Sequence, residues 1–186
     1  MDDLRIVAQR LPLDDIPDAS LAHVYRLWCD RRRDRKMPAP GDMLPEEFGV
    51  ALGKINLLDV LRDPLRFVFR VRGTVIASLH NSSLTGRDVR EIEPAPYRDM
   101  LLEHYAEAAT AGEPTLYHIK QNREAIWNEY RRLILPLGGP ARVDPRANIY
   151  DGGRISGRLG GTVERLLTAS AWGPEFVERA RELGFK

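Results

Sequence analysis

Histidines and carboxylates are the residues of this chain best suited to acid–base chemistry, but their spacing does not bring them together. His104 directly follows Glu103 in a segment with helical periodicity, where adjacent side chains point in different directions. His80 and His118 fall in separate predicted elements, and nothing in their spacing shows that they meet each other or Glu129. General acid–base catalysis needs its partners within hydrogen-bond reach. The sequence therefore predicts that this protein is not an enzyme.

Signatures of nucleotide, redox and metal chemistry are also missing from the sequence. Residues 138–161 are rich in Gly, Pro and Arg, but no Lys-Ser or Lys-Thr follows the glycines as a phosphate-binding loop requires. No Gly-x-Ser-x-Gly or His-Glu-x-x-His motif occurs. Cys29 is the single cysteine, which excludes an internal disulfide and a cysteine-based zinc knuckle. We predict no required cofactor and no metal site.

Composition is typical of a small globular protein without a strong overall charge. The 186 residues, 43% of them hydrophobic, predict a single domain over 1–186. The 28 basic side chains nearly balance the 27 acidic ones, so no overall field exists to hold nucleic acid. Apolar runs are too short to span a membrane, and acids near the start argue against a secretory signal. We therefore predict a cytoplasmic protein.

Hydrophobic periodicity indicates which elements position these residues. Leu21, Val24, Tyr25 and Trp28 follow helical spacing and predict an amphipathic helix at the N-terminal end, over 19–36. A second strong helix is expected over 94–112. Strands are expected over 54–60, 66–72, 115–120, 126–137 and 163–172, with a long loop at 138–161 and a short helix over 173–186. This order predicts an α+β fold with helices on one face of an antiparallel sheet.

The ordered pattern resembles the PAS family, and within it the bacterial stand-alone single-domain proteins with an N-terminal helix. The resemblance covers about residues 20–137, with 163–172 similar to the last strand. The residues that carry it are Leu27-Trp28, Pro38, Asp42, Pro45, residues 66–74 (Arg-Phe-Val-Phe-Arg-Val-Arg-Gly-Thr), Leu84-Thr85-Gly86-Arg87, Gly112-Glu113-Pro114 and Leu135-Pro136-Leu137.

The resemblance implies a PAS-like five-stranded antiparallel sheet within a core of residues 50–172. The helices of 75–112 would close its concave side, which would hold a small apolar ligand or be filled by side chains. Candidate residues for this pocket are Phe67, Phe69, Val71, Ile76, Leu79, Met100, Leu101, His104 and Leu133. The same residues, at strand and helix spacing, would also make an ordinary filled core.

PAS proteins usually signal through a flanking helix, so the resemblance also implies a regulatory role in bacterial signal transduction. With no output segment apparent in the sequence, we expect signalling through a protein partner or self-association. The helix of 19–36 would pack on the sheet or on a second copy. Candidate interface residues are Leu21, Val24, Tyr25, Trp28 and Trp127. Removing residues 1–36 is then expected to abolish association and leave the core folded.

Two alternatives remain open from the sequence. His104 lies on a helix that resembles the one supplying the haem ligand of oxygen-sensing PAS proteins, so a haem sensor is one of them. The other is a small α+β enzyme with a cone-shaped cavity, of the ketosteroid isomerase or dehydratase type. A carboxylate or histidine with a shifted pKa inside the cavity would favour that enzyme. A flavin photosensor is not expected, because no cysteine lies near Gly86-Arg87.

Overall fold

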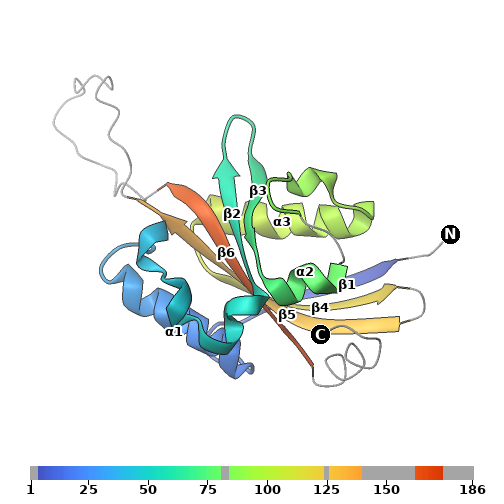
Figure 1. The fold of residues 1–186 in the computed structure, drawn as a ribbon, viewed down its shortest axis with the longest axis horizontal. Helices are drawn as coiled ribbons and strands as arrows, with labels where there is room; N and C mark the ends of the chain where they lie inside the picture. Colours follow the sequence, from blue (N-terminus) through green and yellow to red (C-terminus); the bar gives the residue numbers. More distant parts are fainter. Residues whose placement is uncertain (1–3, 81–83, 124–125, 140–161, 174–186) are drawn as a thin grey trace.

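A computed structural model describes residues 4–80, 84–123, 126–139 and 162–173 of the chain, which form an α+β fold (Figure 1). Four short 3₁₀ segments, at Pro40–Asp42, Pro45–Glu47, Gly49–Lys54 and Val89–Glu91, connect the main elements. Those elements are β1 (Arg5–Leu11), α1 (Ala19–Arg32), β2 (Ile55–Leu61), β3 (Arg66–Arg72), α2 (Thr74–His80), α3 (Ala95–Ala111), β4 (Thr115–Arg123), β5 (Ile126–Gly138) and β6 (Val163–Trp172).

All six strands form one antiparallel sheet in the order β1-β4-β5-β6-β2-β3. β5 and β6 are the central strands, and Leu135 and Leu166 on them are completely buried. β6 pairs with both β5 and β2, so the last described residues join the two halves of the sheet. The α+β class and the antiparallel sheet predicted from the sequence are confirmed.

The sheet has one more strand than the five we expected. β1 adds to the edge of β4, from Arg5 opposite Asn122 to Leu11 opposite Leu116. Most of its side chains are exposed, and Val7 is 60% exposed. Sequence periodicity reports burial of one face, so an edge strand with little burial leaves no clear alternation to detect.

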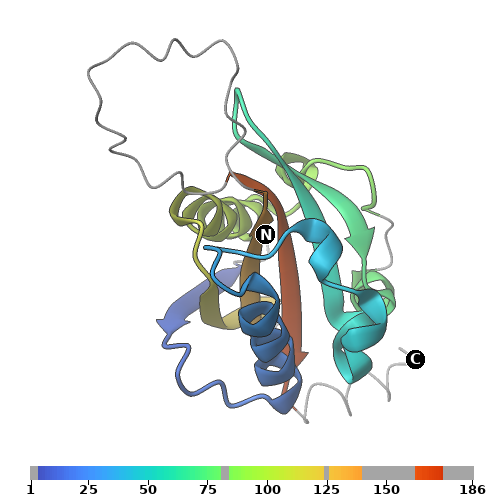
Figure 2. The same ribbon diagram turned by 90° about the vertical axis from the view of Figure 1, so that its left-hand side faces the viewer.

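The two long helices pack on opposite faces of the sheet. Adjacent strand residues point to opposite faces, and Arg131 Nη1 pairs with Asp18 Oδ2 beside α1 at 3.2 Å. Its neighbour Arg132 donates from Nη2 to the hydroxyl of Tyr97 on α3 at 3.0 Å. In Figure 1, α1 lies in front of the sheet and α3 behind it, and Figure 2 shows α1 running alongside the central strands.

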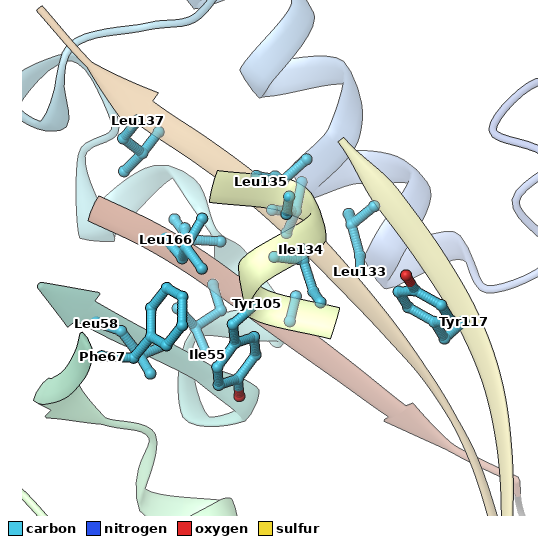
Figure 3. Packing of buried hydrophobic residues seen from close by; sticks show 14 of the residues in the cluster. Ile55, Leu58, Phe67, Tyr105, Tyr117, Leu133, Ile134, Leu135, Leu137 and Leu166 are labelled. Atoms are coloured by element: carbon cyan, nitrogen blue, oxygen red, sulfur yellow. The ribbon is translucent and has the colours of Figure 1, made fainter. Parts of the chain in front are cut away.

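The α3 face contains much of the aromatic core. Tyr105 of α3 meets Phe67 of β3 edge-to-face, with ring centroids 5.6 Å apart (Figure 3). α3 ends where Gly112 adopts a left-handed φ of 63° and its N–H bonds to the carbonyl of Ala108. The long helix and its glycine stop agree with the sequence prediction for 94–112.

Two predicted segments fall largely beyond the described residues. The predicted terminal helix over 173–186 lies outside them except for residue 173, and the predicted loop of 138–161 lies outside them except for residues 138 and 139. Among the described residues, no helix is both long and apolar enough to cross a lipid bilayer.

Candidate functional site

A cavity of about 510 Å³ lies between α3 and the sheet. This volume is within the range of small-molecule sites, roughly 300–1,000 Å³. Its walls come from β2, β3, α2, the segment before α3, α3, β5 and β6, so residues far apart in the chain meet there. Six of its apolar lining residues are Phe69, Ile76, Leu84, Ile92, Leu101 and Trp172.

Arg132 of β5 is the buried charge of this cavity. Arg132 is only 4% exposed, and its Nη2 donates to the hydroxyls of Tyr97 and Tyr130, each at 3.0 Å. The guanidinium also lies over both rings, 5.9 and 5.3 Å from their centroids. Its Nη1 is buried and has no hydrogen-bond partner. No carboxylate of the described residues forms an ion pair with it.

Burial keeps two of the tyrosines near Arg132 neutral at physiological pH. Burial, as the largest effect, raises the pKa of Tyr130 well above its ordinary value, against the opposing charge of Arg132. Burial likewise raises the pKa of Tyr105. Tyr97 and Tyr130 also share a hydrogen bond. Each of these phenols also lines the cavity, so its inner surface combines hydroxyl groups, the buried cation of Arg132, the partly buried Arg72 and apolar side chains.

A short capped segment forms the rim of the cavity. Asp88 Oδ1 accepts from the N–H of Arg90 at 2.9 Å, and Glu91 Oε1 accepts from the N–H of Asp88 at 3.1 Å. This reciprocal capping holds the 3₁₀ turn Val89–Glu91 against β3. Glu91 and Glu93 are exposed where they line the cavity, as is Arg87. The acids are therefore at the rim and the cation Arg132 is deep inside.

Comparison with known proteins identifies the fold. A family model described as PAS domain matches residues 16–147, well over half of the chain. The chain belongs to the PAS domain family. No match was found among curated proteins or among solved structures. PAS domains are sensory and regulatory modules, typically without catalytic activity, and many of them contact ligands or proteins.

Three of the predicted pocket residues line the cavity of this PAS domain, namely Phe69, Ile76 and Leu101. Phe67 and Met100 are buried in the surrounding core. The side chain of Leu79 lies outside the described residues.

Leu133 and Val71 face away from this cavity, which corrects our expectation for both. Leu133 alternates with Arg132 on β5 and is completely buried on the α1 face. Val71 is 52% exposed and lines a second hollow, of about 340 Å³, with Phe48 and Leu57. A register shift between Leu57 and Leu58, where β2 pairs with β3, separates Val71 from the face of Phe69.

His104 of α3 packs on the sheet beside the cavity instead of lining it. Its ring stacks on that of Tyr117 in β4, with centroids 3.6 Å apart and planes 6° apart. The residue is 5% exposed, and its Nδ1 is buried without a partner. Burial, reinforced by the charge of Arg132 and opposed by Glu107, lowers the pKa of His104 to about 4. In this orientation His104 would not reach an iron in the cavity, so the geometry does not favour the haem alternative.

The predicted interface residues are largely part of the chain's own core. Leu21 and Val24 are completely buried and Trp28 is 3% exposed, while Tyr25 is half-buried beside Trp28. Trp28 Nε1 donates to the carbonyl of Pro136 at 2.8 Å. Because these side chains already pack on the sheet, Leu21, Val24 and Trp28 are not free for contact with a second copy. The side chain of Trp127 lies outside the described residues.

Sequence reasoning missed the polar residues of the cavity. Arg132 was not selected, although it shares a face of β5 with Tyr130 and Ile134 while its neighbours Leu133 and Leu135 lie on the other face. A charge at a core position of a strand was the available signal. Tyr97 and Ser170 gave no comparable signal, because only the packing of α3 and β6 brings them to β5.

Proposed function

We propose that this PAS domain is a bacterial signalling module that binds a small organic ligand in the cavity between α3 and the sheet. The observation that supports the proposal is the buried hydrogen-bonding capacity of this cavity, above all the partnerless Nη1 of Arg132. Buried polar groups are normally satisfied in a filled core. A ligand would supply the missing acceptor.

The sheet offers a route from the ligand to the N-terminal helix. Arg132 faces the cavity, while the adjacent Arg131 pairs with Asp18 at the start of α1. A ligand that shifts β5 or changes its mobility would therefore also bias the packing of α1. We expect the output to reach a protein partner from that side of the molecule, and a cytoplasmic location fits this role.

The enzyme alternative has less support from the geometry. It would need a buried carboxylate or histidine in the cavity as an acid–base pair. Of the described residues that line the cavity, the carboxylates are Glu91 and Glu93, and both are exposed at the rim. The ionisable groups deeper inside are arginine and tyrosines, which suit ligand recognition better than proton abstraction.

Ligand binding can be tested by saturation-transfer NMR on the full chain. The probes are benzoate, phenylacetate, indole-3-acetate, octanoate and the carboxamide of each. We expect at least one probe to bind, and Ser170→Leu to abolish its binding, because Ser170 is buried in the cavity wall. Ser78→Leu introduces the same side chain at an exposed site outside the cavity and should leave binding intact. Failure of every probe would count against the proposed function.

A further inference from the structure

We propose that the ligand of this cavity is a small organic acid whose carboxylate is held by Arg132. This inference rests on the ligand-binding function proposed above and names the chemical class of the ligand. It follows from the charge, the hydrogen-bond count and the apolar walls of the cavity.

The charge of Arg132 has no counter-ion within the part of the chain that the structure describes. The residue is 4% exposed, and its hydrogen-bond partners are the hydroxyls of Tyr97 and Tyr130. A buried charge is strongly unfavourable unless it is paired. Because burial keeps Tyr130 as a neutral phenol, this partner does not cancel the charge. An anion entering the cavity would do so.

The hydrogen-bond count points to an acceptor as well. A guanidinium has donors only, and the Nη1 of Arg132 is buried without an acceptor. The hydroxyls of Tyr97 and Tyr130 already accept from Nη2 and share a hydrogen bond with each other. The cluster is thus rich in donors, and a carboxylate has acceptors only.

The acids at the rim favour a carboxylate over a phosphate. The planar fork of arginine binds two oxygens of either group, so it does not choose between them. Glu91 and Glu93 are exposed where they line the cavity and would oppose a doubly charged phosphate more than a singly charged carboxylate. Three guanidinium groups line the cavity: Arg87 is exposed, Arg72 is partly buried, and Arg132 is nearly completely buried. The deepest position therefore offers one guanidinium to a charged head group.

The remainder of the cavity suits an apolar or aromatic body. Phe69, Leu101, Ile92 and Trp172 line it together with the rings of the tyrosines. At about 510 Å³ the cavity has room for a molecule the size of an arylacetic or medium-chain fatty acid. Burial of that body would supply binding energy, while Arg132 would select the charged head.

Matched acids and amides test the inference, because each pair differs in charge and hardly in shape. Isothermal titration at neutral pH is carried out with the full chain and phenylacetate, indole-3-acetate, benzoate and octanoate, each against its carboxamide. We expect an acid to bind about 10- to 100-fold more tightly than its amide, as charge-assisted hydrogen bonds predict. Arg132→Met should remove this preference and leave the weaker amide binding unchanged.

Arg131→Met is the matched control, since Arg131 lies on the same strand but on the α1 face. It should keep the acid preference. Arg132→Lys keeps the positive charge but lacks the planar guanidinium, and it serves as the test if Arg132→Met fails to fold. We expect this variant to bind acids several-fold more weakly and to bind amides as before.

The inference is wrong if amides bind as tightly as acids, or if Arg132→Met keeps the preference for acids. Binding of amides alone would support the cavity as a ligand site and overturn only the carboxylate. Binding of no probe at all would overturn both proposals.

Discussion

At the scale of single residues, two buried ionisable groups of this PAS domain sit close together in different environments. Arg132 lines the cavity, and His104 is packed under α3 against Tyr117. The charge of Arg132 contributes to the low pKa of His104, after the larger effect of burial. His104 is therefore neutral in the folded protein at pH 7, which makes acid conditions a direct probe of its packing.

The pH dependence of folding should report His104. Its pKa is about 4 when folded and about 6.5 when unfolded, so the unfolded chain binds more protons between these values. The stability linked to neutral His104 is therefore present above pH 6.5 and is lost as the pH falls towards 4. We expect a loss of about 3 kcal/mol across this window that His104→Phe does not show. Urea unfolding from pH 7.5 to 4 measures it, and parallel curves for the two proteins would refute it.

At the scale of elements, α1 behaves as part of the PAS core. It buries Leu21, Val24 and Trp28 on the sheet face that carries Leu133 and Leu135. β1 differs, because it adds an edge strand whose side chains are mostly exposed. The two N-terminal elements should therefore contribute very differently to stability, although both precede the strands of the predicted core.

Deleting residues 1–36 should abolish cooperative unfolding, whereas the sequence led us to expect that this truncation leaves the core folded. Full burial of each large apolar side chain contributes about 1.5–3 kcal/mol, and α1 provides three of them. Their sum approaches the whole stability of a small domain, about 5–15 kcal/mol.

Deleting residues 1–11 removes β1 alone and provides the control. We expect this protein to keep a cooperative thermal transition and a native near-ultraviolet circular dichroism spectrum. A cooperative transition in the longer deletion, within a few degrees of the full chain, would show that α1 is dispensable.

At the scale of the whole molecule, the buried charge of the cavity lowers the stability of the protein, and packing in the rest of the fold offsets this loss. The sheet and α3 hold Arg132 buried without a counter-ion among the described residues, within a core that is mostly apolar. Replacing buried ionic groups by well-packed apolar side chains is often neutral or stabilising, by about 1–4 kcal/mol. Function would then explain why an arginine occupies this position.

Arg132→Met should accordingly leave the free energy of unfolding of the ligand-free protein unchanged or raise it. Urea unfolding by tryptophan fluorescence measures the change, and Arg131→Met shows the effect of losing an arginine from the opposite face. A loss of more than about 2 kcal/mol in Arg132→Met would assign the arginine a structural role instead.

Local patterns were sufficient for several elements of this protein. The pattern of β3 places Phe67 and Phe69 on one face and Arg66 and Arg70 on the other, and the strand was predicted with its observed limits. α3 was predicted from its apolar face and its Gly112 stop. The sequence predicted residues 163–172 as a strand with less certainty of type, because a short apolar run fits a strand or a helix. The pairing of this segment with β5 and β2 shows that it is a strand.

The sequence by itself determined the α+β class and the order of the main elements, because each depends on periodicities within single segments. It also carries the ordered motifs that resemble PAS domains. The tertiary structure alone decided the edge position of β1, the packing of α1 on its own sheet, and the meeting of Arg132 with Tyr97. Those features depend on strand register and on contacts between segments far apart in the chain. A local sequence pattern does not show which distant segments meet in the fold, so the cavity became visible only in the folded protein.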